Sequence, residues 1–401
     1  MRKRILSDLD DVLLRGRRVL VRVDFNVPIE NGQVADDTRI LASLPTLTWL
    51  IEREARTMLL SHLGRPGGRR DAAYTLAPVA ERLRQLIGAR VRFVDQVHGP
   101  AVESAVAVLA PGEVMLLENV RFEKGEEEDD AALGAQLAAL ADVYVNDAFG
   151  TAHRAHATTS AVPRAMRDAG KPAVAGFLVE KELRFLGAAL ADPRRPFVAI
   201  LGGAKISGKI DVVESLLPRV DALLVGGAMA NTFFRALGLE TGQSLVEPDR
   251  IAMASELMER AGDKLVLPTD CLVAPAAKAG ARATVCARDG VPPDQRILDI
   301  GPDTVAAFGV HIARAATVLW NGPLGLFEVA DFAGGTRGVA QAVAEATGRG
   351  ATTIAGGGDT AAALEQAGLS DRVTHVSTGG GASLEFLEGR TLPGIAVLDD
   401  A

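Results

Sequence analysis

Short apolar runs alternate with longer amphipathic segments from one end of the chain to the other. Near-continuous apolar runs are typical of strands buried on both faces of a sheet. We expect strands at 18–24, 57–62, 91–95, 114–119 and 142–147, and after a break at 197–203, 221–227, 264–270, 317–322, 352–358 and 373–378. The intervening segments are long enough for helices, for example 38–54, 76–87, 248–261 and 335–347. This alternation predicts a doubly wound α/β pattern that occurs twice.

The segment between the two sets of strands reads as one continuous helix. Leucine, phenylalanine and alanine fall on one face of 176–190, charged residues fall on the other, and Asp-Pro-Arg-Arg-Pro at 192–196 ends it. A helix that joins two domains suits hinge motion. The chain of 401 residues is also long for a single core. We therefore predict two parallel-sheet, Rossmann-like domains, 1–175 and 193–389, joined by a hinge helix at 176–192.

Composition and charge narrow the class of protein. Hydrophobic residues make up 48% and charged residues 23% of the chain, as in ordinary globular proteins. The net charge of −8 argues against a general nucleic-acid binder, which needs a basic surface. No run is long enough to span a membrane, and no apolar segment follows the basic residues 1–6 as in a signal peptide. Cys271 and Cys286 are too few for a disulfide framework. We expect a cytoplasmic protein that binds neither membranes nor nucleic acids, with a monomer as the default.

In the first half, charged side chains follow the predicted strands. Ligands of open parallel sheets bind beyond the carboxyl ends of the strands. The residues at these positions, with those of the loop 148–157 and with Arg39, are rich in arginine and histidine: Asp24, Asn26, Arg39, His62, Arg65, Arg121, Asn146, Asp147, His153, Arg154 and His156. Arginine binds phosphate or carboxylate with two parallel hydrogen bonds. One such arginine is more often a surface ion pair, but the recurrence at one topological position predicts an anion pocket.

In the second half, the predicted strands end in glycine-rich loops, which let backbone N–H groups approach phosphate oxygens. The segment 203–210 has the spacing of a P-loop, but Ile210 replaces the Ser or Thr that would hold Mg²⁺. The segment 356–361 is similar to a dinucleotide-binding turn, but the next strand ends in Ser377 and Thr378 without an acidic residue for a ribose. Together these loops predict a phosphate-binding surface that is neither a standard P-loop NTPase nor a dehydrogenase.

Three charged residues extend this second prediction. Lys205 and Lys209 are one helical turn apart, so we expect them on the same side of a helix start, unless they are solvated surface lysines. Asp359, directly after three glycines, is the best candidate ligand for a nucleotide-bound Mg²⁺, or else a helix cap. The acidic run 125–130 reads as a solvated helix N-terminus and not as a metal site.

Nine segments, in order, resemble the signature segments of the phosphoglycerate kinase family. They are RVDFNVP (22–28), SHLGRP (61–66), ENVRF (118–122), NDAFGTAHRAHA (146–157), EKEL (180–183), GGAKISGK (202–209), WNGPLGLFE (320–328), GGGDT (356–360) and STGGGASLEFLEG (377–389). The resemblance implies the reversible reaction 1,3-bisphosphoglycerate + ADP ⇌ 3-phosphoglycerate + ATP, with Mg²⁺ as cofactor. It also implies that a C-terminal tail, 390–401, packs back on the first domain.

The resemblance also implies roles for individual residues. Those similar to the family's phosphoglycerate site are Asp24, Phe25, Asn26, Arg39, His62, Leu63, Gly64, Arg65, Arg121, His153 and Arg154. Those similar to its nucleotide site are Lys205, Lys209, Gly226, Gly227, Asn321, Pro323, Glu328, Gly357, Gly358, Asp359 and Thr360, with Asp359 towards Mg²⁺. The chain departs from the family pattern at Thr158, Ala228, Leu324 and Leu326, which we interpret as tuning of pocket shape.

The layout predicts catalysis by positioning and charge stabilisation, since the attacking phosphate or carboxylate is already ionised near neutral pH. We expect hinge closure to bring Arg39 from one domain and Lys205 and Lys209 from the other to the transferring phosphoryl group. Three alternatives remain open at this point. They are another small-molecule acyl-phosphate kinase, a regulatory protein that closes on nucleotide without chemistry, and an NAD-dependent dehydrogenase.

Overall fold

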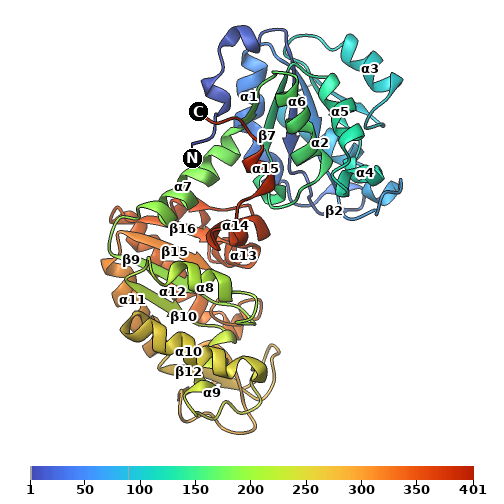
Figure 1. Cartoon of the computed structure of the whole chain (residues 1–401). Helices are drawn as coiled ribbons and strands as arrows, with labels where there is room; N and C mark the ends of the chain where they lie inside the picture. Colours follow the sequence, from blue (N-terminus) through green and yellow to red (C-terminus); the bar gives the residue numbers. More distant parts are fainter. Residues whose placement is uncertain (1, 89) are drawn as a thin grey trace. The chain divides into compact units, whose positions relative to one another are not determined.

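The computed structural model describes residues 2–88 and 90–401, which divide by their internal contacts into two compact units (Figure 1). Unit 1 comprises the residues up to Arg184 together with Thr391–Ala401, and unit 2 is Phe185–Arg390. Helix α7 (Phe177–Ala191) begins in unit 1 and ends in unit 2. The prediction of an α/β protein with a parallel sheet in each half is confirmed.

Unit 1 is built on a six-stranded parallel sheet with the strand order β5-β6-β4-β1-β7-β8. Four of the five strands predicted here, β1, β4, β5 and β6, end before the predicted residue, because the last polar residues leave the sheet to form the loops, whereas β7 ends at Asp147 as predicted. The strand β8 is too short and too alanine-rich to be found from the sequence. The bounds are β1 (Arg18–Val23), β4 (Arg56–Leu60), β5 (Val91–Val94), β6 (Val114–Leu117), β7 (Val143–Asp147) and β8 (Ala173–Ala175).

Helices cover both faces of this sheet. Right-handed crossovers place α1 (Thr38–Glu52) and α2 (Ala77–Ile87) on one face, because their connections run towards β5. The connections through α3, α5 and α6 run towards β8 and lie on the other face. Besides α7 and short 3-10 and π-helical segments, unit 1 also contains α3 (Pro100–Ala107), α4 (Lys124–Glu127), α5 (Ala131–Ala139), α6 (Val162–Asp168), α15 (Pro393–Ala396) and the hairpin β2 (Ile29–Glu30) and β3 (Gln33–Val34).

The first turn of α7 is held by two side chains of unit 1. The Phe177 N–H donates to Thr46 Oγ1 at 3.0 Å, and the Leu178 N–H donates to Asp147 Oδ1 at 2.9 Å. Burial raises the pKa of Asp147 to about 7. The Phe177 ring also packs edge-on against Trp49, with ring centroids 5.6 Å apart. The start of α7 is therefore fixed to α1 and to the end of β7.

The C-terminal tail returns to unit 1. The Gly394 N–H donates to the Ala152 carbonyl at 2.9 Å, and the Gly394 carbonyl accepts from the Asn146 side chain at 2.9 Å. Further along, the Asp399 N–H donates to the Ala173 carbonyl at 2.8 Å. These bonds join the last residues of the chain to strands β7 and β8 and to the loop that follows β7.

Unit 2 has a second six-stranded parallel sheet, with the order β11-β10-β9-β15-β16-β17. Read in chain order this is the 3-2-1-4-5-6 arrangement of doubly wound sheets, in which the connections reverse direction between β9 and β15. The carboxyl ends of those two strands are therefore the expected ligand position. The bounds are β9 (Phe197–Leu201), β10 (Ala222–Val225), β11 (Leu265–Val266), β15 (Thr317–Asn321), β16 (Thr352–Gly356) and β17 (His375–Val376).

A small antiparallel sheet of order β13-β12-β14 is added to unit 2. The single strand predicted at 264–270 is wrong, because β11 ends at Val266 and Asp270 already begins β12. Pro268 separates the two strands and has no N–H to continue a ladder. The bounds are β12 (Asp270–Ala274), β13 (Thr284–Ala287) and β14 (Arg296–Ile300).

The helices of unit 2 pack on both faces of its parallel sheet. They are α8 (Ile210–Leu216), α9 (Met229–Ala236), α10 (Ile251–Ala261), α11 (Pro302–Arg314), α12 (Gly334–Gly348), α13 (Gly358–Gln366) and α14 (Gly381–Leu387). A buried apolar core that includes Trp320, Phe308 and Ile200 lies between the sheet and α11, α12 and α13. Over residues 2–88 and 90–401, none of the helices has both the length and the apolarity to cross a membrane.

Candidate active site

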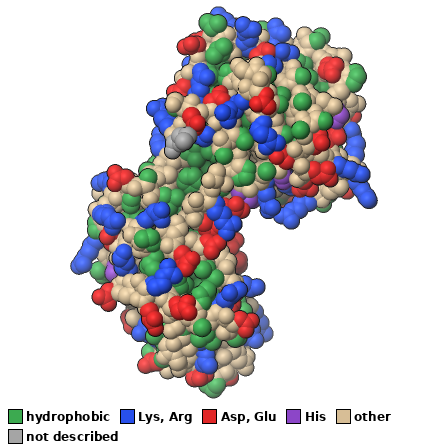
Figure 2. Space-filling view, viewed as in Figure 1, with side chains coloured by type: hydrophobic (Ala, Val, Ile, Leu, Met, Phe, Trp, Pro, Cys, Tyr) green, Lys and Arg blue, Asp and Glu red, His purple; other side chains and the backbone are tan. Residues whose placement is uncertain are grey.

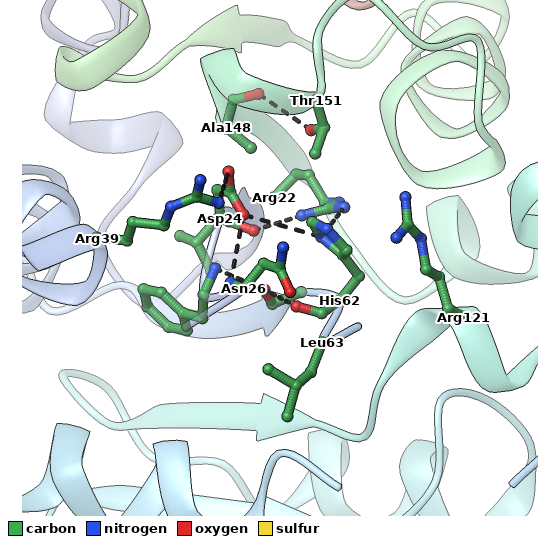
Figure 3. Close-up of polar contacts among 12 residues, drawn as sticks. Arg22, Asp24, Asn26, Arg39, His62, Leu63, Arg121, Ala148 and Thr151 are labelled. Carbon is green, nitrogen blue, oxygen red and sulfur yellow. Dashed lines mark hydrogen bonds and ion pairs between the residues drawn. The ribbon is translucent and has the colours of Figure 1, made fainter. Parts of the chain in front are cut away.

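The loops after the strands of unit 1, here called the unit 1 rim, bring charged side chains together around Asp24. Its Oδ2 accepts a hydrogen bond from Arg39 Nη1 at 2.9 Å, and its Oδ1 lies 3.9 Å from His62 Nδ1 (Figure 3). Asn26 Oδ1 accepts from the Gly64 N–H at 2.9 Å, which ties the loop after β1 to the loop after β4. In Figure 3, Arg39 and Arg121 flank this group on opposite sides.

Arg22 is a member of this cluster that sequence reasoning missed, because its position inside an apolar strand gave no functional signal. It is 1% exposed, and its guanidinium lies 3.2 Å from His62 Nδ1. Its Nε donates to Thr158 Oγ1 at 2.8 Å, and Thr158 Oγ1 donates to Glu126 Oε1 at 2.6 Å. Glu126 also accepts from the Thr158 N–H at 2.9 Å. A fully buried carboxylate therefore supports a buried arginine below the unit 1 rim.

The acidic run 125–130 is only partly as predicted. It does provide a helix start, α4, and Asp130 caps α5 by accepting from the Leu133 N–H at 2.7 Å. The prediction of a solvated run is wrong for Glu126, whose side chain is 0% exposed. Arg22 and Thr158 lie far away in sequence, so no local pattern identifies the residue that is buried. Among the described residues no group of three or more metal-binding side chains occurs.

The electrostatics of the unit 1 rim favour anions. Burial, and then the charges of Arg22, Arg121 and Arg39, hold the pKa of His62 well below its usual value. Burial and the nearby Arg121, Arg22 and Arg154 lower the pKa of His156 to about 4. Both histidines are therefore neutral at pH 7, and the charge comes from arginine. The positive charge of these guanidinium groups adds to burial in lowering both histidine pKa values, and the same charge favours an anion bound at this rim.

The remaining predicted residues of this group lie on the same rim. Arg121 Nη1 donates to the Gly64 carbonyl at 2.7 Å, and Asn119 donates to the Leu63 carbonyl at 2.7 Å. Arg154 Nε donates to His153 Nε2 at 3.1 Å. Arg65 is exposed, whereas Phe25 is fully buried and its N–H donates to Ser61 Oγ at 2.9 Å. Histidine and basic side chains gather along the lower edge of this unit in the view of Figure 2.

The corresponding loops of unit 2, the unit 2 rim, are held together by backbone bonds. After β9, the Gly202 N–H donates to the Asn321 carbonyl at 3.0 Å and the Gly203 N–H donates to the Pro323 carbonyl at 2.9 Å. A Cβ on Gly202 would lie 2.1 Å from the Pro323 oxygen. Glycine is therefore required for the loops after β9 and β15 to approach each other, at the position where the sheet topology expects a ligand.

The two predicted lysines occupy different surroundings. Lys209 is the N-cap residue of α8, which begins at Ile210, whereas Lys205 lies in the loop before it, so the expected helix start is correct for Lys209 and wrong for Lys205. Lys205 is exposed, whereas Lys209 Nζ donates to both the backbone and the side-chain oxygen of Asn321, at 2.8 Å to the backbone. Burial lowers the pKa of Lys209 to about 8, and the charge of Asp359 opposes this shift.

Asn321 and Thr360 connect the strand ends behind this lysine. The Asn321 amide donates to the Gly356 carbonyl at 2.9 Å, and Thr360 Oγ1 accepts from the Gly322 N–H at 2.7 Å. Gly357, with φ of +93°, caps the start of α13, and Gly358 and Asp359 form its first turn. Asp359 is therefore in the first turn and is not the cap residue itself.

A cavity of about 350 Å³ opens beside these loops. Gly227, Pro323, Glu328 and Asp359 line it, as do residues of β14 in the small antiparallel sheet. The cavity walls are mainly apolar, which suits a nucleobase more than a second phosphate. Of the predicted nucleotide residues, Lys205, Lys209, Gly226, Asn321, Gly357, Gly358 and Thr360 are not part of its lining.

Asp299 is a second buried carboxylate that the sequence did not reveal. It lines the cavity, is 2% exposed, and accepts from the Gly335 N–H at 2.6 Å and the Ile300 N–H at 2.9 Å. Burial raises its pKa to about 7. A Cβ on Gly325 would lie 2.1 Å from Asp299 Oδ1, so this carboxylate packs directly under the loop that carries Glu328.

The chain is similar to known proteins along its whole length. A model of the family described as phosphoglycerate kinase matches residues 9–390. The chain is 54% identical over 407 aligned positions to a phosphoglycerate kinase of Chloroflexus aurantiacus, with all of both chains covered. It is 51% identical to one of Fervidobacterium nodosum, with 100% of this chain and 99% of the relative covered.

Solved structures show the same likeness. The structure of phosphoglycerate kinase from Coxiella burnetii matches with a TM-score of 0.89 and 43% identity, over 98% of each chain. The crystal structure of phosphoglycerate kinase from Pyrococcus horikoshii OT3 matches with a TM-score of 0.83 and 30% identity, over 99% of this chain and 98% of that one. The likeness covers both units and both rims.

Proposed function

The chain belongs to the phosphoglycerate kinase family, and we propose that unit 1 binds the phosphoglycerate and unit 2 the nucleotide. The reaction of this family is 1,3-bisphosphoglycerate + ADP ⇌ 3-phosphoglycerate + ATP, a step of glycolysis, and the chain is accordingly a kinase with a carboxyl acceptor. The observation that supports assigning the two substrates to different units is the difference in charge between the two rims. Unit 1 presents several arginines, whereas unit 2 presents glycine backbone and a mainly apolar cavity.

On unit 1, a phosphate and a carboxylate of the ligand would each meet guanidinium groups. Arg65, Arg121 and Arg154 lie at the rim, where Arg121 also forms an ion pair with Glu127 at 3.3 Å, and His153 and the neutral His62 would serve as hydrogen-bonding partners. Asp24 orients Arg39, while the loop from Leu63 to Gly64 supplies backbone groups. Asn26 holds that loop, and Phe25 is buried in the same apolar cluster as Leu63. We assign this set to phosphoglycerate binding.

On unit 2, the nucleobase would enter the cavity lined by Gly227 and Pro323, and the phosphates would extend over the first turn of α13. Gly357 and Gly358 leave backbone N–H groups open there, where the helix dipole favours negative charge. Glu328, exposed at the cavity, is placed to accept from a ribose hydroxyl. Gly226, Asn321 and Thr360 support these loops from behind.

The site fits a magnesium ion that arrives with the nucleotide. A Mg²⁺ held mostly by phosphate oxygens and water needs only one or two carboxylates, and Asp359 is an exposed carboxylate in the first turn of α13 that lines the cavity. When bound, the ion would neutralise charge on the nucleotide phosphates. Asp359→Asn is expected to raise the Mg²⁺ concentration needed for half-maximal activity.

Transfer itself needs no general base in this chain, since the attacking phosphate or carboxylate oxygen is already ionised. We propose that Arg39 of unit 1 and Lys205 and Lys209 of unit 2 stabilise the charge of the transferring phosphoryl group. This requires a hinge closure of the two units about α7, which also excludes water. Small-angle X-ray scattering tests it, since the radius of gyration must fall only when both substrates are bound.

The decisive assay is ATP-dependent oxidation of NADH in a coupled system that starts from 3-phosphoglycerate, with and without Mg²⁺. Activity with 3-phosphoglycerate but not with acetate, carbamate or glycerate supports this assignment over another acyl-phosphate kinase, which nothing in the comparisons favours. A binding protein without chemistry would show nucleotide binding and no turnover, and a dehydrogenase would transfer a hydride from its substrate to added NAD⁺, giving NADH without any ATP.

We further propose a monomer that works in the cytoplasm. The catalytic groups named above all come from one chain, so a partner copy is not needed to complete either rim. Light scattering at working concentration tests the first point, and fractionation of the source cells tests the second.

A further inference from the structure

The two cysteines of the chain lie opposite each other on neighbouring antiparallel strands. Cys271 is in β12 and Cys286 is in β13, and the strand register makes these two residues direct partners. The sequence contains no other cysteine, and both are free thiols. Direct cross-strand partners project from the same face of a sheet. The two thiols therefore face each other across one strand spacing.

The Cα spacing of these strands lies within the range that a disulfide can join. The Arg288 N–H donates to the Thr269 carbonyl at 3.0 Å, two positions away in the same register, so Cys271 and Cys286 also form a hydrogen-bonded pair. The Cα atoms of such a pair are about 5.5 Å apart. Disulfides join Cα atoms that are about 4.4–6.8 Å apart. A disulfide also needs Cβ atoms about 3.5–4.5 Å apart, whereas the Cβ atoms of directly opposite residues lie about 4.5–5.5 Å apart and are closer in non-hydrogen-bonded pairs than in hydrogen-bonded ones. The bond therefore requires β12 and β13 to move closer at this pair, but no change of register.

The same pair belongs to the wall of the nucleotide cavity. Cys271 lines the cavity, and its partner on the other side, Ile300 of β14, lines it too. Ile300, Cys271 and Cys286 thus form a row across one face of the β14-β12-β13 sheet. A disulfide between Cys271 and Cys286 would pull the Cys271 sulfur towards β13 and thereby change the shape of the cavity wall that contacts the nucleotide.

We propose that Cys271 and Cys286 are a reversible disulfide site in the wall of this cavity, and that oxidation weakens nucleotide binding. The first part stands on the strand register alone. The second part rests on the proposed binding of the nucleotide in this cavity. The site is a property of this chain's own cysteine positions and is separate from the transfer chemistry.

The step is a thiol–disulfide exchange with a small disulfide such as oxidised glutathione. The Cys286 thiolate attacks one sulfur of the reagent, which forms a mixed disulfide and releases one thiolate. The Cys271 thiolate then attacks Cys286 Sγ, which forms the protein disulfide and releases the second. Two protein thiols and one reagent disulfide give one protein disulfide and two reagent thiols, and a dithiol reductant reverses the step.

The surroundings determine which cysteine reacts first. Cys271 is 1% exposed, and burial, followed by the nearby Cys286 and Asp270, raises its pKa to about 12, while Arg288 opposes the shift. Cys286 is half-buried on the edge strand β13, and burial and Asp270 raise its pKa as well. Cys286 therefore meets the reagent first, and the exchange accelerates as the pH rises, because the thiolate is the nucleophile.

Oxidised glutathione and mass spectrometry of the whole folded chain test the site. The wild type is expected to lose both free thiols and the mass of two hydrogen atoms. Trypsin cleaves after Lys278 and Arg282, which lie between the cysteines, so peptides 265–278 and 283–288 should remain linked until reduction. The matched control Cys286→Ser leaves the cavity lining intact and cannot form the bond. Retention of both thiols, a stable mixed disulfide or a dimer between chains would overturn the proposal.

Titration calorimetry with ADP then tests the effect on the cavity. The oxidised wild type is expected to bind ADP at least about threefold more weakly than the reduced form, with full recovery on reduction, while Cys286→Ser is unaffected by the oxidant. Formation of the disulfide with unchanged ADP affinity would overturn the link to the nucleotide. A reduced chain that binds no ADP would instead contradict the proposed role of unit 2, and would leave the mass result intact as evidence on the disulfide.

Discussion

The rims of the two sheets occupy the same topological position but are built from different groups. The unit 1 rim presents charged side chains, and each needs support: Asp24 orients Arg39, and Thr158 and Glu126 hold Arg22. The unit 2 rim presents backbone, and its main requirement is space, as at Gly202. A side-chain site thus depends on buried polar partners, whereas a backbone site depends on the absence of side chains.

The largest effect should come from the group assigned to the transferring phosphoryl. Arg39→Ala is expected to lower kcat roughly 10³-fold while the KM for ATP changes less than about twofold, because this arginine belongs to unit 1. Steady-state kinetics in the coupled assay measure both constants. Arg17→Ala, an exposed arginine with an equal change of charge, is the control. Near-normal turnover of Arg39→Ala would remove its catalytic role.

The unit 2 rim should be disrupted by a single added methyl group, as in a glycine-to-alanine substitution. Gly202→Ala places a Cβ against the Pro323 carbonyl, so we expect about 1–3 kcal/mol lower stability and a KM for ATP raised about 100-fold. Thermal unfolding and kinetics test this. Gly208→Ala is the matched control, since a Cβ at Gly208 meets no atom within 4 Å. Equal behaviour of the two variants would contradict the steric explanation.

Substitutions of the buried residues that hold the unit 1 rim in place are expected to have smaller effects than substitutions in the rim itself. Glu126→Gln leaves Thr158 with one fewer buried acceptor, so Arg22 is held less well and the KM for 3-phosphoglycerate should rise about tenfold. The KM for ATP should stay the same. Thr158→Val should act similarly and Thr158→Ser should not, while Glu128→Gln, an exposed neighbour in the same acidic run, serves as control. A parallel rise of both KM values would indicate general misfolding instead.

The smallest expected effect is a pH dependence of nucleotide use, caused by the titration of Lys209 in unit 2. Because the pKa of Lys209 is about 8, it loses its charge above that pH, and kcat/KM for the nucleotide should fall severalfold between pH 7 and pH 9. Stability should move in the opposite sense. The unfolded chain, with a lysine pKa of 10.5, binds more protons than the native state between these values, so this group's contribution to stability rises from pH 8 to 10.5. Both trends should vanish in Lys209→Met.

Local sequence patterns determined most of the architecture. Apolar runs bounded by polar or glycine residues predicted the two parallel sheets, and the amphipathic segment 176–190 predicted α7. Residues directly after strands could be named as site candidates because parallel strands all end at the same edge. The assignment of those residues to phosphoglycerate and nucleotide came from resemblance and remains a prediction for each residue.

Only the tertiary structure decided which polar residues are buried. Arg22 sits in an apolar strand, Glu126 in an acidic run and Asp299 in an antiparallel sheet, and none of these contexts distinguishes a buried charge from a solvated one. Their partners come from distant segments, as Thr158 does for Glu126, and long-range pairing leaves no local period in a sequence. The same holds for Cys271 and Cys286. Their separation along the chain is uninformative, and it is the register of β12 and β13 that makes them neighbours.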